Sequence, residues 1–300
     1  MRFFTFFIVF INIFYLDYGF ANNERVIIDG HNVYSPALVM QDSKLKMYFG
    51  GWDRAGDTED GIYRADCAHP HMPCNNIKKV VDPSSNALRS TLQQVNDPSI
   101  VLHPSGRYYI MYMTGVRRGR PEDGFDPKNN RIYYSTSWAS DGANWSAPQE
   151  LIAGAWLPSA TVNKNGEIVL FANSNINGTV VMYNLGKSGV TVKPPVRIRT
   201  NNFINYLNVD VLFRPNLAQG GLYQILAERF PRAGQPNQID YLTSTDGINW
   251  SIGREGVVRP SAGEMSVNTP APHPQTHGWL YYGSTNRTDS TAYQIFYRPW

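Results

Sequence analysis

Long apolar runs are scarce in this 300-residue sequence. Hydrophobic residues make up 42% of the chain, but they occur in short segments broken by 25 glycines and 20 prolines, which excludes a chain built from long helices. The one extended apolar run, Phe3 to Leu16, follows a single arginine and precedes a small-x-small cleavage pattern ending at Ala21. Because a membrane-spanning helix needs roughly 20 apolar residues, a signal peptide is favoured over a membrane anchor. We predict a signal peptide over 1–21 and a secreted or periplasmic mature chain over 22–300, with no membrane span.

Cysteine and charge of one sign are also scarce. Cys67 and Cys74 are the only cysteines, and export makes a disulfide between them the natural expectation. His69 and His71 lie between them, but the spacing matches none of the common zinc patterns, so we predict no metal site there. The net charge is only +3, and Lys/Arg runs are absent from the sequence, which argues against a nucleic-acid partner. The sequence does not show whether the protein has a protein partner, and we predict no organic cofactor.

One pattern, a strand start followed by a polar turn and an aromatic-rich second strand, recurs along the chain. Its copies are "VYSPALVMQDSKLKMYFGGWD", "VNDPSIVLHPSGRYYIMYMTG", "WLPSATVNKNGEIVLFANSN", "NVDVLFRPNLAQGGLYQILAERF" and "VNTPAPHPQTHGWLYYGSTNR". Each continues with a third strand, and the first four with a fourth segment: "IKKVVDP", "APQELIAG", "PPVRIRT" and "REGVVRP". Regular repeats of this kind are typical of a propeller.

The last copy stops one strand short at Trp300. The segment "ERVIID", Glu24 to Asp29, can supply the missing strand, and closing the ring removes two open sheet edges. We therefore predict an all-β fold: a single five-bladed β-propeller over 22–300, its ring closed by the mature N-terminal strand.

Two of the turns between third and fourth strands share a sequence, "SDGANWS" from Ser140 and "TDGINWS" from Thr245. Asp-Gly supplies tight-turn chemistry, and the tryptophans, Trp145 and Trp250, are expected to pack on their blades. The turns resemble the Asp boxes of sialidase-like propellers. They are structural markers and identify no substrate.

In a propeller, the start of each innermost strand and the end of each second strand meet on one face around the central channel, which is the default ligand site. The residues at the strand starts are Ser35, Asp97, Pro158, Asp210 and Asn268, with Trp156 and Tyr206 just before two of them. The second strands end at Asp53-Arg54, Arg117-Arg118, Asn173 to Asn175, Glu228-Arg229 and Asn286-Arg287.

Arginine recurs at these second-strand ends. The four recurring residues, each six positions after a tyrosine, are Arg54, Arg118, Arg229 and Arg287. A ring of guanidinium groups suits a carboxylate, sulfate or phosphate, and it predicts an anionic ligand. Local pairing with neighbouring acids is the alternative.

Aromatic residues, at 13% of the chain, favour a sugar as the ligand, because flat rings stack on the apolar faces of sugars. Trp52, Trp156 and Tyr206 are the candidate platforms. Packing in the core between blades is the alternative for each.

The repeat rhythm, "NDPSIV" at Asn96, "YFGG" at Tyr48 and the Asp-Gly-x-Asn-Trp turns together resemble family 43 glycoside hydrolases, the arabinanases and β-xylosidases, and their invertase and levansucrase relatives. The resemblance covers nearly all of 22–300. It implies three acids on inner strands: an Asp base, an Asp that orients and tunes, and a Glu general acid. Asp97 matches the second position.

The other two expected positions hold Ser35 and Trp156, which cannot replace a carboxylate. Asp53 is the best substitute base and Glu228 the best substitute acid, each with an Arg-paired structural role as its alternative. We predict no cofactor, and the sequence leaves open a structural calcium ion in the central channel. We predict either hydrolysis of an oligo- or polysaccharide that is acidic, or a non-catalytic glycan-binding propeller.

Overall fold

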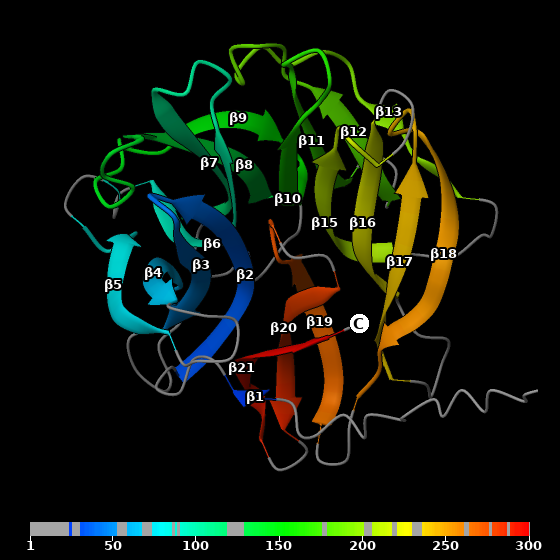
Figure 1. Cartoon of the computed structure of the whole chain (residues 1–300). Helices are drawn as coiled ribbons and strands as arrows, with labels where there is room; N and C mark the ends of the chain where they lie inside the picture. The colour runs from blue at the N-terminus through cyan, green and yellow to red at the C-terminus, as the bar shows by residue number, and fades with distance from the viewer. Residues whose placement is uncertain are drawn as a thin grey trace, which may run out of the picture.

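The chain forms five antiparallel sheets arranged around a common centre, as the computed structural model shows (Figure 1). The structure describes residues 24–25, 31–52, 59–67, 74–85, 88, 91–118, 129–175, 179–200, 206–217, 221–229, 236–260, 264–275, 278–286 and 289–299. The predicted signal peptide lies outside these ranges. Within them, no helix is long and apolar enough to cross a membrane.

Each sheet is one blade, and its strands follow one another in sequence from the centre outwards, except for one short outer strand in each of the last two blades. The first blade contains β2 (His31–Gln41), β3 (Lys44–Trp52), β4 (Gly61–Cys67) and β5 (Asn75–Val81). The second contains β6 (Leu92–Leu102), β7 (Tyr108–Arg117), β8 (Asn130–Trp138) and β9 (Gln149–Ala153). The third contains β10 (Ala155–Val162), β11 (Ile168–Ser174), β12 (Thr179–Asn184) and β13 (Val196–Arg197).

The fourth blade contains β15 (Tyr206–Arg214), β16 (Leu222–Arg229), β17 (Gln238–Ser244) and β18 (Asn249–Val258). The fifth contains β19 (Glu264–Pro272), β20 (Trp279–Asn286) and β21 (Asp289–Pro299). The two-residue strand β1 (Glu24–Arg25) pairs antiparallel with β21. Because the rest of "ERVIID" lies outside the described residues, ring closure by the whole segment stays a prediction.

The fourth segment of the third blade departs from the sequence-based prediction. Only Val196 and Arg197 pair with β12, while β14 (Arg199–Thr200) runs parallel to β18 of the next blade. A proline pair precedes this segment and Pro lacks the donor that a ladder needs. The segment therefore bridges two blades instead of completing one.

The apolar core is divided into five clusters, one between each pair of neighbouring blades. The cluster between the last and first blades joins Met47 and Phe49 of β3 to Tyr281 of β20 and Ile295 of β21. The other clusters fill the remaining four junctions. Side-chain packing therefore closes the ring between the fifth and first blades independently of the N-terminal strand.

Every innermost strand has a bulge at the same place. In each blade, two residues of the innermost strand have no partner on the second strand. They lie between Asn96 and Ser99 in β6, for example, and between Trp156 and Ser159 in β10. In four blades the first skipped residue has a positive φ and precedes a proline; these residues are Ser35, Asp97, Leu157 and Thr269, with φ of 49°, 50°, 54° and 43°. Non-glycine residues adopt this region rarely. The bulges therefore bring residues of four blades to the centre, where they line one cavity.

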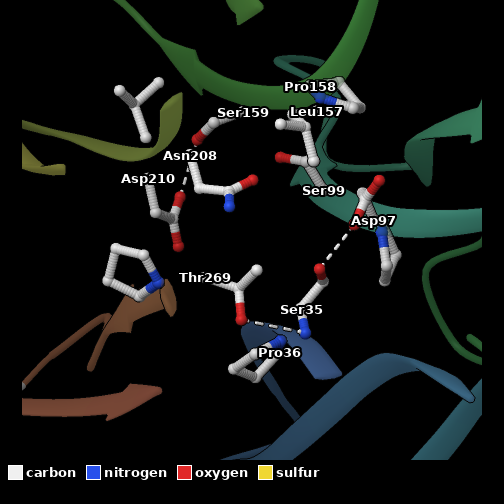
Figure 2. A pocket seen from close by; sticks show the side chains of 13 residues that line it. Ser35, Pro36, Asp97, Ser99, Leu157, Pro158, Ser159, Asn208, Asp210 and Thr269 are labelled. Atoms are coloured by element: carbon white, nitrogen blue, oxygen red, sulfur yellow. Dashed lines mark hydrogen bonds between the residues drawn. The ribbon is translucent and has the colours of Figure 1, made fainter. Parts of the chain in front are cut away.

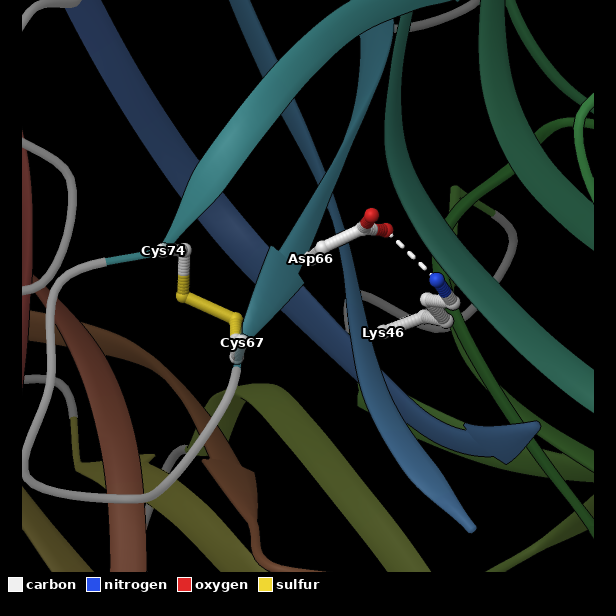
Figure 3. Close-up of a disulfide and its surroundings, with 4 residues drawn as sticks. All are labelled: Lys46, Asp66, Cys67 and Cys74. Atoms are coloured by element: carbon white, nitrogen blue, oxygen red, sulfur yellow. Dashed lines mark hydrogen bonds and ion pairs between the residues drawn. A yellow bond between two sulfur atoms is a disulfide. The ribbon is translucent and has the colours of Figure 1, made fainter. Parts of the chain in front are cut away.

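The predicted disulfide is confirmed: Cys67 and Cys74 are bonded (Figure 3). Both belong to the core cluster between the first and last blades. Beside them an ion pair joins Lys46 Nζ and Asp66 Oδ1 at 2.6 Å. His69 and His71 lie outside the described residues.

Replacing both cysteines by serine should lower the free energy of unfolding by about 2–3 kcal/mol, because the bond closes a short loop in the unfolded chain. Urea denaturation of the double variant measures this loss. Reduced wild type is the control and should match the variant. A reduced wild type as stable as the oxidised protein would contradict the prediction.

Candidate functional site

Two connected cavities occupy the centre of the ring, where the innermost strands converge. The wider one has a volume of about 370 Å³. The narrower one, about 40 Å³, has room only for water. They share wall residues, among them Ser35, Asp97 and Thr269, and Figure 2 shows side chains from all five blades pointing toward one another around the narrower cavity.

Amide side chains dominate the polar lining of the wider cavity. These residues are Asn32, Asn96, Asn130, Asn208 and Asn268. The side-chain oxygens of Asn96, Asn130 and Asn268 are buried and find no hydrogen-bond partner among the described residues. Buried acceptors are nearly always satisfied, and the described residues supply no donor to these three oxygens.

Three aromatic rings complete this lining, those of Tyr34, Trp156 and Tyr293. Tyr34 and Tyr293 meet edge to face, with their centroids 6.0 Å apart. The wider cavity thus combines apolar ring surfaces with unpaired amide acceptors.

Asp97 is the one carboxyl group that lines the wider cavity among the described residues. The hydroxyl of Ser35 donates to Asp97 Oδ1 at 2.5 Å, and Thr114 also donates to this carboxyl. Burial raises the pKa of Asp97 to about 6, although both donors act in the opposite direction. Asp97 therefore changes charge within the neutral pH range.

A second carboxyl group, Asp60, lies one layer behind the cavity wall. Tyr34 donates its hydroxyl to Asp60 Oδ2 at 2.5 Å, and Asn96 donates to the same oxygen at 3.4 Å. The indole of Trp52 supplies a further hydrogen bond. Burial raises the pKa of Asp60, and its nearness raises the already high pKa of Tyr34. Asp60 thereby fixes the orientation of two residues that line the cavity.

Glu228 occupies a similar place in the fourth blade. It is 3% exposed and accepts hydrogen bonds from Asn208, from Asn237 and from the backbone N–H of Thr269. Burial raises its pKa. Asn208 and Thr269 both line the wider cavity, so Glu228 contacts the cavity wall from behind and does not line it.

Asp210 lines the narrower cavity, and so does Asp97. Ser159 donates to Asp210 Oδ1 at 2.6 Å (Figure 2). Burial raises the pKa of Asp210 to about 7, more than its hydrogen bonds lower it. Although two carboxyl groups face this cavity, no group of three or more His, Cys, Asp or Glu side chains in the described part of the chain could hold a metal.

The two described arginines of the predicted ring are both ion-paired. Arg118 pairs with Glu59 at 2.8 Å, and both side chains are exposed. Arg229 pairs with buried Asp240 at 2.6 Å and with Glu255 at 3.1 Å. Both arginines therefore form local ion pairs with neighbouring acids, which was the alternative to an anion-binding ring. Arg54, Arg287 and Asp53 lie outside the described residues.

The predicted aromatic platforms separate into three cases. Trp156 lines the wider cavity, and Trp52 contacts Asp60 behind it. Tyr206 is buried between the third and fourth blades and donates to Asp240. It therefore packs in the core between blades instead of forming a platform in the cavity.

Sequence reasoning missed Tyr34, Asp60, Asn96, Asn208 and Tyr293 as members of the site. Tyr34 and Asn96 carried a usable signal, since each lies directly before a bulge residue that is followed by proline. Asp60 and Tyr293 carried none, because long-range packing alone brings them to the centre.

Comparison with known proteins identifies the fold. No protein-family model and no curated protein matches the sequence. A thermostable family 43 glycoside hydrolase matches in structure with a TM-score of 0.66 and 11% identity over 89% of each chain. The GH43_1 enzyme from Xanthomonas citri, in complex with xylotriose, gives a TM-score of 0.67 and 12% identity over 92% of this chain and 89% of that one.

The catalytic domain of a GH62 α-L-arabinofuranosidase from Coprinopsis cinerea gives a TM-score of 0.62 and 12% identity, covering 91% of this chain and 94% of that one. The chain therefore has the five-bladed propeller fold found in glycoside hydrolases of families 43 and 62.

Proposed function

We propose that the central cavity binds part of an oligo- or polysaccharide. The supporting observation is the lining itself: five asparagine side chains, of which Asn96, Asn130 and Asn268 each have a buried unpaired oxygen, line a cavity whose wall also contains three aromatic rings. Amide side chains and aromatic rings are groups that suit sugar hydroxyl groups and sugar ring faces, and a volume of about 370 Å³ is within the usual range of ligand sites. Two propellers of the same fold are known with xylotriose and cellotriose bound.

The acidic character of the glycan and the export of the protein belong to this proposal. No Lys or Arg is among the described residues that line either central cavity, so the acidic character rests on Arg54 and Arg287. Export rests on the N-terminal apolar run and agrees with the disulfide.

Replacing Trp156 by alanine should weaken binding of a soluble oligosaccharide at least tenfold, because it removes a stacking surface worth roughly 1.5 kcal/mol. Isothermal titration against a panel of neutral and acidic oligosaccharides measures the change. Trp156→Phe, which keeps a ring, should recover most of the affinity. Leu217→Ala, at an exposed turn after β15, should bind like wild type.

Equal affinities of Trp156→Ala and wild type would refute the proposed site. The same titration in 50 mM and 500 mM NaCl tests the acidic character. An acidic ligand loses affinity at high salt, and Arg54→Ala with Arg287→Ala should remove that dependence.

Hydrolysis of a glycosidic bond is the second candidate function. It is favoured by Asp97, a cavity carboxyl whose pKa is raised to about 6, with the carboxyl groups of Asp60 and Glu228 behind the wall on other blades. Raised carboxyl pKa values are what proton donation to a leaving oxygen requires. Release of reducing ends from the same panel tests it.

A further inference from the structure

A second concave surface lies at the opposite ends of the strands in the second blade. It has a volume of about 610 Å³ and its walls include Tyr108, Tyr134, Trp138 and Trp145. Asn130 at the start of β8 lines the central cavity, whereas Trp138 ends the same strand. At roughly 3.3 Å per residue, about 26 Å separate the two sites along β8. We call this surface the lower groove.

The lower groove arises from a local difference between two otherwise similar turns. The turn of the fourth blade runs Ser244-Thr245-Asp246-Gly247, whereas that of the second blade has two more residues, Trp138 and Ala139, between the matching serine and Asp-Gly. In the fourth blade Trp250 is 2% exposed, and its indole N–H donates to the carbonyl of Gly247 at 2.9 Å. The two additional residues of the second blade, Trp138 and Ala139, are therefore not needed to form a turn of this type.

Trp138 is 70% exposed, the highest value among the large hydrophobic side chains that the structure describes as exposed. An indole ring held at the rim of a concave surface exposes apolar area to water. Its ring is available for stacking against a ligand.

Two polar groups of the lower groove are buried without a partner. Neither the hydroxyl of Ser137, on a side chain 3% exposed, nor the indole N–H of Trp145 has a hydrogen-bond partner among the described residues. Both residues line the lower groove. Both atoms are covered by the wall, so contact with a ligand falls to the accessible groups of the lining.

The rest of the lining narrows the ligand class. The remaining polar wall residues are neutral, namely Thr136, Asn144, Ser146 and Ser188, and none of the described residues that line the lower groove carries a charge. Ring faces combined with hydroxyl and amide groups suit a neutral sugar. An acidic glycan or a charged peptide finds no counter-ion in this lining.

We propose that the lower groove is a second carbohydrate site, specific for a neutral oligo- or polysaccharide and separate from the central cavity. It requires nothing of the proposed central site. A polymer bound there is held while the central cavity remains open to another segment of the same or another chain.

The test is retention of the full chain on insoluble neutral polysaccharides, namely xylan, cellulose and β-glucan. The protein is made in a host that does not N-glycosylate, because Asn144-Trp145-Ser146 is an acceptor sequence. Trp138→Ala should reduce the bound fraction at least tenfold on the polysaccharide that retains wild type. Trp138→Phe should restore most of it, and Leu217→Ala should behave as wild type.

Three outcomes overturn the proposal. In the first, none of the three polysaccharides retains the wild-type protein. The second is loss of retention in Trp156→Ala but not in Trp138→Ala, which assigns the binding to the central cavity. The third is Trp138-dependent retention on phenyl agarose alone, which assigns the lower groove to an apolar protein partner. Failure of the central site instead appears in titrations with soluble oligosaccharides, so the two proposals fail separately.

Discussion

Replacing Asp210 by asparagine should stabilise the protein by about 2–4 kcal/mol at pH 8.5, since a pKa raised to about 7 in the folded state corresponds to roughly that cost for ionising the buried carboxyl. The asparagine oxygen still accepts the hydrogen bond from Ser159. The variant differs from wild type mainly in remaining neutral at every pH.

The sign of the effect follows from proton uptake. Between the unfolded pKa, about 3.9, and the folded pKa near 7, the native state binds more protons than the unfolded state, so wild type loses stability as pH rises. The gain from Asp210→Asn should therefore grow between about pH 4 and pH 7 and stay constant above. Urea denaturation at a series of pH values measures it.

Asp246→Asn is the matched control, because the surroundings of Asp246 lower the pKa of its carboxyl group, whereas those of Asp210 raise it. Backbone and side-chain donors lower the pKa of Asp246 to about 2. The same substitution there should destabilise the protein at neutral pH. If the increase in the free energy of unfolding caused by Asp210→Asn did not vary with pH, the pKa of the Asp210 carboxyl group would not be raised in the folded state.

The second large effect concerns chemistry. Under the proposal that the protein hydrolyses glycosidic bonds, Asp97→Asn should lower the cleavage rate about a thousandfold, because Asp97 is the one carboxyl lining the wider cavity among the described residues. The asparagine side chain preserves the shape of the wall and the acceptor for Ser35, so oligosaccharide affinity should change only a few-fold.

Rates and affinities are measured on the same protein samples, by reducing-end release and by titration. Glu228→Gln is the comparison, since Glu228 acts on the cavity through Asn208 and Thr269. It should weaken binding more than it slows cleavage. A wild-type protein that cleaves no glycan of the panel removes hydrolysis and leaves the binding proposal standing, whereas an active Asp97→Asn excludes Asp97 from the chemistry.

Much of the fold was predictable, because its signals are local. Short apolar segments, polar turns and Asp-Gly-x-Asn-Trp sequences recur at regular spacing, and the structure confirms five blades in the expected order. The split of the third blade's outer segment was not predictable: whether Arg199 pairs with its own blade or with β18 depends on how the blades sit beside each other.

The candidate site was predictable only in part. Ser35, Asp97 and Trp156 line the wider cavity because each lies at or beside the bulge of an innermost strand, and their roles toward a ligand stay predictions. Arg118 and Arg229 followed a regular spacing, but their partners, Glu59 and Asp240, come from loops and strands that no spacing rule connects to them.

The sequence by itself determined the five-fold repeat, the disulfide between Cys67 and Cys74 and the position of Asp97 on an inner strand, because alternation, turn chemistry and cysteine number are properties of neighbouring residues. Only the tertiary structure decided which side chains share the central cavity and that Trp138 stands exposed over a lower groove. Those properties depend on distances between residues of different blades, and such distances are set by the packing of five sheets around one axis.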